Sequence, residues 1–377
     1  MKTSHLIIGA GPAGLAMAGR FSSTGIDYEI LEQSDKVAVA WHNHYDRLHL
    51  HTVKQLSALP HMDFPDDYPV YVPRAKLVEY FQNYIQTFSI RPHFNTEVKS
   101  LKKKTDNWLV KTNTGKDIIA KNVIIATGVN RNMNIPNWPG KDQYKGSIIH
   151  SRNYKNPLPY KNQKVLVIGM GNTGAEVALD LTEHDVETHL AVRGEVGLIP
   201  RDVNGQPVQL TARKLDKLPF GLGDWLGTQI RKVIIGDMSK YGLRVSKMHP
   251  AAQLKETGKT PVIDIGTAKA IKQGKIKVHP GIKEFKSDGV MFTNGVSESY
   301  DAIILATGYR ADVQDYLEST DGLLDHNNLP IEKIGQGNRK GLYFLGYDNY
   351  KLGGIFGTIR DDSLLILNDI ATQNQGN

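Results

Sequence analysis

Residues 5–14 read HLIIGAGPAG, an apolar run that ends in a glycine-rich turn. Gly9, Gly11 and Gly14 have the G-x-G-x-x-G spacing that joins a strand to a helix in dinucleotide-binding proteins. The first glycine permits the tight turn, the second lets the backbone approach a pyrophosphate, and the third lets the helix pack against the strand. The pyrophosphate lies at the positive end of that helix. The stretch therefore predicts a βαβ unit that holds a dinucleotide at its turn.

An acidic residue follows this unit at the place where ribose is recognised. A second strand-like run, residues 28–31, ends at Glu32, which is 32 − 14 = 18 residues after Gly14. A carboxylate there accepts hydrogen bonds from ribose hydroxyls and repels a ribose phosphate. The first loop is therefore predicted to take FAD or NAD rather than NADP. A generic βαβ turn with a surface glutamate is the alternative.

The same pattern recurs at residues 164–174, KVLVIGMGNTG, with Gly169, Gly171 and Gly174 at the same spacing. Here the next strand-like run ends at a cation, Arg193, where the first unit has a carboxylate. A guanidinium binds a ribose 2′-phosphate through two hydrogen bonds, so this loop is predicted to take NADPH. Arg201 is a second candidate for the phosphate. Alternatively, Arg193 is an ordinary surface residue and the loop takes NADH and NADPH equally.

Two further segments, residues 123–128 (VIIATG) and 302–309 (AIILATGY), are near-copies of each other. Each is a strand-like run that ends in Ala-Thr-Gly and follows hairpin-like sequence. The chain thus contains two related halves. They predict an α/β fold with two Rossmann-like dinucleotide-binding domains, in which the NADPH domain is inserted into a discontinuous FAD domain.

The predicted FAD domain covers residues 1–155 and 298–377, and the predicted NADPH domain covers residues 160–297. A linker is expected near the Asn-Pro-Leu-Pro stretch at 156–159. Residues 205–257 are the least familiar part. They are predicted to form a helix packed on the domain, with a helical flap over a channel and a membrane-surface helix as alternatives.

Composition narrows the chemistry. The 377 residues include no cysteine, which excludes disulfides, iron–sulfur clusters and dithiol relays, so a bound organic cofactor must carry any redox step. The chain is 40% hydrophobic and 23% charged, as in ordinary globular proteins, and it lacks a run long enough to span a membrane. The formal charge of +7 is scattered along the chain, which argues against nucleic acid and suits anionic small molecules. A strand-like run that starts at residue 5 leaves no room for a signal peptide, so a cytoplasmic location is expected.

A third motif lies between the glycine loops and carries a family resemblance. Tyr144, Gly146, His150 and Tyr154 form the pattern aromatic-x-Gly-x-x-x-His-x-x-x-aromatic. This resembles the fingerprint of the flavin-containing monooxygenases, although the family usually begins it with Phe. Within that family the chain looks most like the YUCCA-type indole-3-pyruvate monooxygenases, which have segments similar to residues 45–51 (YDRLHLH), 258–267 (GKTPVIDIGT) and 274–278 (GKIKV).

The resemblance implies an NADPH- and O2-dependent monooxygenase with bound FAD. NADPH would reduce the flavin, dioxygen would add at flavin C4a, and the resulting (hydro)peroxide would oxygenate a small organic substrate, such as a 2-oxo acid like indole-3-pyruvate. By register with the family, His51 would lie near C4a and Lys54 beside it, and both are predicted to be catalytic. A histidine that only satisfies backbone groups is the alternative for His51.

The resemblance and the motifs together predict the cofactor contacts. They are Gly9, Gly11, Pro12, Ala13, Gly14, Glu32, Gln33, Trp41, His42, Thr52, Val98, Ala126, Thr127, Gly128, His150, Ser151, Gly169, Gly171, Asn172, Thr173, Gly174, Arg193, Arg201, Thr307, Gly308, Tyr309 and Leu352.

Other functions stay open on the sequence. An NADPH oxidase, or a quinone or flavin reductase of the same fold, would need the same two loops but transfer no oxygen. A flavin-binding sensor is less favoured, because a sensor does not need its own hydride donor. The histidines at 42, 44, 49, 51 and 61 lack a completing ligand set, so no metal is predicted. A small-molecule substrate and O2 are the predicted partners, with no nucleic acid, no stable membrane insertion, and a homodimer as an open option.

Overall fold

The computed structural model describes residues 1–215, 222–248, 253, 260–348 and 354–375. The chain forms two compact units. The first comprises Met1–Asn43, Thr52–Asn132 and Tyr309–Asn377, and the second comprises His44–His51 and Met133–Gly308. The chain passes from one unit to the other after Asn43, after His51, within β6 (Asn132–Met133) and just before β19 (Tyr309–Arg310).

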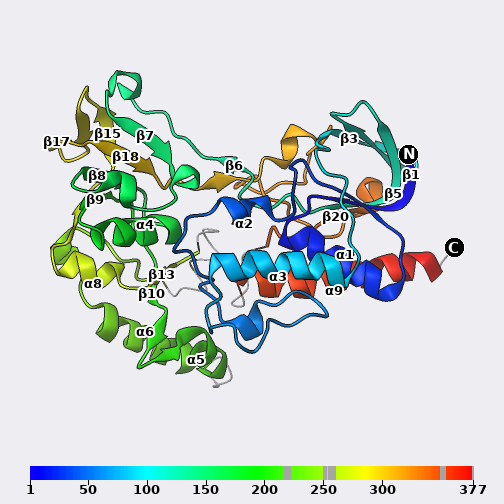
Figure 1. The fold of residues 1–377 in the computed structure, drawn as a ribbon, viewed down its shortest axis with the longest axis horizontal. Helices are drawn as coiled ribbons and strands as arrows, with labels where there is room; N and C mark the ends of the chain where they lie inside the picture. Colours follow the sequence, from blue (N-terminus) through cyan, green and yellow to red (C-terminus); the bar gives the residue numbers. More distant parts are fainter. Residues whose placement is uncertain (216–221, 249–252, 254–259, 349–353, 376–377) are drawn as a thin grey trace. The chain divides into compact units, whose positions relative to one another are not determined.

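The first unit is built on a six-stranded sheet in the order β2-β1-β5-β4-β3, with β20 also paired to β5. Strands β2, β1, β5 and β20 are parallel, and β4 and β3 continue the sheet as an antiparallel hairpin. Helix α1 packs against α3 and α9, and the three lie side by side in Figure 1. Its elements are β1 (Lys2–Ile8), α1 (Pro12–Thr24), β2 (Glu29–Leu31), α2 (Val39–Asn43), α3 (Arg74–Thr87), β3 (Val98–Lys104), β4 (Asn107–Thr112), β5 (Asp117–Ile125), β20 (Leu342–Phe344) and α9 (Gly354–Gln375).

The second unit is built on a five-stranded parallel sheet in the order β14-β9-β8-β18-β7. Helix α4 packs against β8, β9 and α8. The main elements are β7 (Ser147–His150), β8 (Lys164–Ile168), α4 (Asn172–Thr182), β9 (Glu187–Ala191), α8 (Thr267–Lys272), β14 (Ile276–His279) and β18 (Ala302–Leu305). Smaller pieces are β10 (Leu198–Pro200) paired with β13 (Val262–Asp264), the hairpin β11 (Asp202–Val203) and β12 (Gln206–Pro207), and the antiparallel sheet β15 (Ile282–Phe285), β16 (Gly289–Phe292) and β17 (Ser297–Ser299).

The boundaries of the compact units differ from those of the predicted domains. Strand β18 pairs in parallel register with β8, Ile303 opposite Leu166, and with β7 on its other side. These pairings place residues 133–155 and 298–308, which the sequence analysis gave to the FAD domain, in the second unit. Residues 44–51 also belong to the second unit, because they pack on α4.

Residues 205–257 include two helices, α5 (Val208–Leu215) and α6 (Leu222–Ile235). They pack against each other, and α6 also packs against β10. This arrangement fits the packed-helix interpretation within the second unit. Parts of the segment, residues 216–221, 249–252 and 254–257, lie outside the described residues.

Two histidines lie side by side in the sheet of the second unit, His189 buried and His279 partly exposed. The ring of His189 is fully buried, with Nδ1 2.9 Å from the hydroxyl of Tyr300 and Nε2 3.1 Å from a carboxylate oxygen of Glu187. The Nε2 atom of His279 lies 2.9 Å from the same Nδ1, and its ring stacks on Phe292 at 4.3 Å. Burial lowers the pKa of both rings, that of His189 to about 4.

This pair is expected to make the folded state sensitive to acid. An unfolded histidine has a pKa near 6.5. Between pH 6.5 and 4 this histidine is therefore protonated in the unfolded chain, whereas His189 of the folded protein stays neutral. Stability is therefore present above pH 6.5 and lost as the pH falls towards 4, by at most about 3 kcal/mol for this ring. Thermal unfolding of wild type and His189→Gln from pH 7.5 to 4.5 measures this, with exposed His49→Gln as the control. Equal pH slopes in wild type and His189→Gln would contradict it.

Candidate functional site

The first glycine loop joins β1 to α1 and leaves space at one glycine only. A Cβ on Gly14 would lie 1.8 Å from the carbonyl oxygen of Gly9. Gly9 itself has φ +103°, and its Cβ would lie 2.7 Å from the carbonyl oxygen of Ala126. At Gly11 a Cβ would meet nothing within 4 Å, and no side chain caps the start of α1. The protein needs glycine at two positions, whereas the space at Gly11 is open to a ligand at a helix N-terminus.

Glu32 anchors the end of β2 to this loop. The residue is buried, and one carboxylate oxygen accepts a hydrogen bond from the backbone N–H of Ala10 at 2.8 Å. The other accepts from the backbone N–H and the hydroxyl of Ser34, at 2.9 and 2.7 Å. A negative charge is thus fixed beside the first loop, where a ribose phosphate would be repelled.

The second glycine loop repeats the first in detail. A Cβ on Gly174 would lie 2.0 Å from the carbonyl oxygen of Gly169, and Gly169 has φ +105° with a Cβ position 2.5 Å from the carbonyl oxygen of Ala306. Gly171 again faces open space. The side chain of Asn172 accepts a hydrogen bond from the backbone N–H of Ile263 at 2.7 Å, which ties the loop to β13.

Cations gather beyond the end of β9. Arg193 is exposed there, and the guanidinium of Arg244, also exposed, donates a hydrogen bond to the Arg193 carbonyl at 3.1 Å. Arg201 instead pairs with its neighbour Asp202 at 2.8 Å. Sequence reasoning missed Arg244, because it follows Arg193 by 51 residues and is brought there by the bridge between Val196 and Val245.

The two Ala-Thr-Gly segments end strands β5 and β18. The hydroxyl of Thr127 lies 2.6 Å from that of Tyr347 and 3.1 Å from that of Tyr316. The three hydroxyls form a cluster in the first unit, and both tyrosines are buried. Thr307 donates to the carbonyl of Asn134 at 2.5 Å, and the amide of Asn134 donates back to the Thr307 carbonyl at 3.1 Å. Both threonines thus fix the turns that follow these strands, Gly128 and Gly308 having φ +78° and +84°.

The residues of the aromatic–glycine–histidine motif make hydrogen bonds and close contacts within the second unit. Tyr144 donates to the carbonyl of Tyr300 at 2.7 Å, and a Cβ on Gly146 would lie 2.3 Å from the Tyr144 hydroxyl. His150 accepts from the backbone N–H of Arg152 at Nδ1, so its proton is on Nε2, which donates to the Gly308 carbonyl at 3.1 Å. Burial lowers the pKa of His150, which favours this neutral form.

His51 lies on the second unit and contacts helix α4. Its Nε2 is 3.1 Å from a carboxylate oxygen of Glu176, a buried residue that also accepts from the hydroxyl of Tyr45 at 2.8 Å. Arg47 of the same segment binds Asp180 at 3.2 Å. Sequence reasoning singled out His51 but missed the carboxylate that holds it.

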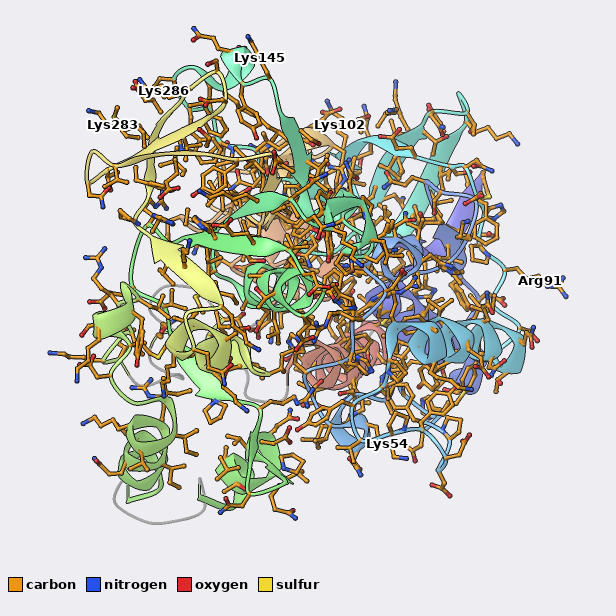
Figure 2. All side chains as sticks on the ribbon, turned by 60° about the vertical axis from the view of Figure 1, so that its left-hand side comes forward. Lys54, Arg91, Lys102, Lys145, Lys283 and Lys286 are labelled. Atoms are coloured by element: carbon orange, nitrogen blue, oxygen red, sulfur yellow. The ribbon has the colours of Figure 1, made fainter. Side chains whose placement is uncertain are left out.

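Lys54, the other predicted catalytic residue, lies in the first unit and is drawn in Figure 2. Its ammonium donates to the carbonyls of Pro65, Asp66 and Tyr68, at 3.3, 2.8 and 2.7 Å. Three backbone acceptors thus match the three N–H donors of an ammonium group. These contacts hold the loop 65–68, and the catalytic role of Lys54 stays a prediction.

The remaining predicted contacts have mixed surroundings. Trp41 packs on Phe81 and Phe356 with ring centroids 6.4 and 5.6 Å away, and the Thr52 hydroxyl lies 2.7 Å from that of Ser57. The carbonyl of His42 accepts from Arg74. Buried positions are Ala13, Val98, Ala126 and Ser151, partly exposed ones are Pro12, Thr173 and Tyr309, and Gln33 is exposed. Leu352 lies outside the described residues.

Known proteins with similar sequences identify the family to which this chain belongs. A family model described as "Flavin-binding monooxygenase-like" matches residues 4–329. The chain belongs to this family. Indole-3-pyruvate monooxygenase YUCCA1 of Oryza sativa subsp. japonica is 36% identical over 375 residues, covering 98% of this chain and 91% of the rice protein. Indole-3-pyruvate monooxygenase YUCCA6 of Arabidopsis thaliana is 36% identical over 364 residues, covering 93% of this chain and 87% of its own length.

Solved structures share the fold. A flavin-containing monooxygenase from Stenotrophomonas maltophilia superposes with a TM-score of 0.73 at 20% identity, covering 97% of this chain and 98% of the bacterial one. An oxidized steroid monooxygenase bound to NADP gives a TM-score of 0.75 at 17% identity, covering 98% and 84%. The predicted α/β fold with two Rossmann-like domains is confirmed.

Membership of the flavin-binding monooxygenase family fixes the class of reaction. The chain is an FAD-dependent monooxygenase that uses NADPH and O2. Its own residues fit both cofactors: each loop has one glycine that faces open space at a helix N-terminus, with a carboxylate beyond the first and guanidinium groups beyond the second. In the part of the chain that the structure describes, none of the helices is long and apolar enough to cross a membrane.

Proposed function

We propose that this monooxygenase acts on a small aromatic 2-oxo acid such as indole-3-pyruvate. The observation that carries the proposal is the 36% identity with the rice indole-3-pyruvate monooxygenase over 98% of the chain. The net charge of +7 supports an anionic substrate, because a positive protein concentrates anions near its surface. A cytoplasmic location and a homodimer are part of the same proposal.

The division of labour between the loops belongs to the proposal as well. Gly11 and the N-terminus of α1 would hold the FAD pyrophosphate, with Glu32 facing the ribose. Gly171 and the N-terminus of α4 would hold the NADPH pyrophosphate, with Arg193 and Arg244 at the 2′-phosphate. Bound FAD supplies electron transfer from NADPH to dioxygen and delivery of one oxygen atom. The chain contributes orientation of the two cofactors and exclusion of water.

Turnover with a panel of substrates tests the substrate. Purified FAD-loaded enzyme is expected to consume NADPH and O2 with indole-3-pyruvate and to release CO2 together with the acid one carbon shorter. Under 18O2, one labelled oxygen atom should appear in that acid. A tertiary amine, a sulfide and a cyclic ketone are the comparison substrates, and a faster reaction with any of them would overturn the 2-oxo acid.

The same assay separates the oxygenase from its nearest alternative. If the enzyme releases one peroxide per NADPH whichever compound is added, it works as an NADPH oxidase on these substrates. If dioxygen is dispensable and a quinone accepts the electrons, the reductase interpretation holds. Either outcome contradicts the proposed function.

A further inference from the structure

Residues 44–51 leave the first unit and pack on helix α4 of the second. The chain on either side, up to Asn43 and from Thr52, belongs to the first unit. Within the segment, Tyr45, Arg47 and His51 all direct polar groups at α4. The same helix begins at the second glycine loop.

Two carboxylates one helical turn apart receive these groups. Glu176, with 3% of its side chain exposed, accepts from Tyr45 at 2.8 Å and lies 3.1 Å from Nε2 of His51. Asp180, with 5% exposed, accepts from Tyr154 at 2.7 Å and from Arg47 at 3.2 Å. Positions i and i+4 lie on one face of a helix, so the segment is held by two neighbouring anchors. Only Glu176 contacts the histidine.

Glu176 fixes which way the imidazole faces. With Nε2 donating to a buried carboxylate, the ring orientation and the position of one proton are set, and Nδ1 is the remaining nitrogen. Among the described residues, Nδ1 of His51 has no hydrogen-bond partner. The His51 side chain keeps 15% exposure, and Nδ1 is not one of the buried polar atoms without a partner among the described residues, so it is not sealed from solvent.

We propose that Glu176 is a positioning residue for the oxygen chemistry: it holds His51 so that Nδ1 is presented for hydrogen bonding and proton exchange with the reacting oxygen species. The inference rests on the proposed monooxygenase function and on the catalytic role that the sequence analysis predicts for His51. It does not depend on which substrate the enzyme uses. Without the carboxylate, the ring would rotate freely and protection of the reduced, oxygen-exposed enzyme would fail, so NADPH would be consumed without product.

The test is a double-mutant cycle on FAD-loaded enzyme in the absence of substrate. The readouts are NADPH oxidation, peroxide release and, independently of turnover, the nitrogen NMR shifts of the His51 ring, which report whether Nε2 keeps its proton toward residue 176. Glu176→Leu removes the acceptor at similar volume, His51→Leu removes the imidazole, and the double variant removes both. Each single variant is expected to raise substrate-free peroxide release on the order of tenfold, and the double variant no further than His51→Leu alone. KM for NADPH should stay within about twofold.

Asp180→Leu is the matched control, because it removes the neighbouring buried anchor and leaves the contact with His51 in place. It is expected to lower the melting temperature by a similar amount as Glu176→Leu and to leak peroxide at the wild-type rate. Should Glu176→Leu fail to retain FAD, Glu176→Gln serves in its place, with a smaller increase because the amide oxygen still accepts a hydrogen bond.

Three results would overturn the inference. The first is peroxide release from Glu176→Leu at the wild-type level. The second is an equal increase in Asp180→Leu, which would make the effect one of helix stability. The third is multiplication of the two single effects in the double variant, which would show that Glu176 acts independently of His51. A failed reaction with indole-3-pyruvate, in contrast, removes the proposed substrate and leaves this cycle unchanged.

Discussion

Gly11→Ala is expected to fold like the wild type and lose FAD, whereas Gly171→Ala keeps FAD and loses NADPH. Both glycines have ordinary extended backbone angles, φ −78° and −89°, and a Cβ at either would meet no protein atom within 4 Å. Alanine therefore costs the empty protein little. The added methyl group occupies the space through which the backbone would approach a pyrophosphate.

The expected size of each effect is a loss of roughly 10- to 100-fold in affinity for one cofactor, since losing a hydrogen bond to a charged group costs about 1.5–3 kcal/mol. FAD retention is measured from the absorbance of the purified proteins and by titration of the apoprotein. NADPH affinity is measured as KM and by titration of NADP+. Each variant is the control for the other, because the substitution and its surroundings are the same in both loops.

Gly14→Ala separates a cofactor effect from a folding effect. Its Cβ would lie 1.8 Å from the Gly9 carbonyl oxygen, so α1 cannot keep its place against β1. This variant is expected to be destabilised in the absence of any cofactor, by several kcal/mol in a fluorescence-monitored urea titration. If Gly11→Ala is destabilised as strongly as Gly14→Ala, the space at Gly11 is needed by the protein. If Gly11→Ala weakens NADPH instead of FAD, the assignment of cofactors to loops is wrong.

The parts of the site that the sequence predicts are those set by local geometry. A glycine loop, the strand before it and the helix after it lie within Lys2–Thr24 in the first unit and Lys164–Thr182 in the second, so spacing alone predicts the close packing of Gly14 and Gly174 on their own loops. The charge at the end of the next strand is equally local: Glu32 follows β2 and accepts a hydrogen bond from the backbone N–H of Ala10 in the first loop, while its contact with a ribose stays a prediction. The two Ala-Thr-Gly segments end buried strands of the two sheets, also as predicted.

Contacts between distant segments could not be predicted in this way. Glu176 meets His51 across 125 residues, and Arg244 meets Arg193 across 51. In the sequence both look like ordinary polar positions, one inside an amphipathic helix and one after a turn. The unit boundaries differ for a related reason, since the sheet order β18-β8 is a pairing over more than 130 residues that no local pattern encodes. The contacts of Lys54 with the carbonyls of residues 65–68 were likewise not evident from the sequence, and its catalytic role stays a prediction.

Arg193→Gln is expected to raise KM for NADPH by 30- to 100-fold, about 2–3 kcal/mol, the usual strength of a charge-assisted contact to phosphate. NADH lacks the phosphate, so its KM should change by no more than about twofold. The exposed guanidinium lies just beyond β9, opposite in charge to Glu32 of the first loop. Steady-state kinetics with both nucleotides give the ratio of KM for NADPH to KM for NADH in the wild type and in the variant.

Arg244→Gln tests whether the site holds two cations. Its guanidinium donates to the backbone carbonyl of Arg193, which brings a second cation to the end of β9. A dianionic phosphate would neutralise both, so this variant should raise KM for NADPH by roughly 5- to 10-fold and also spare NADH. Added salt should weaken NADPH binding more in the wild type than in either variant.

Lys145→Gln is the charge-matched control. Lys145 is exposed and labelled in Figure 2, and it precedes β7, which is three strands from β9 in the same sheet, roughly 14 Å at normal strand spacing. Removing its charge should leave the NADPH/NADH ratio unchanged. Should Arg193→Gln affect both nucleotides equally, the arginine serves the shape of the loop and not the phosphate. The second loop would then accept NADH and NADPH alike. The opposite charges of Arg193 and Glu32 would no longer indicate which loop binds which cofactor.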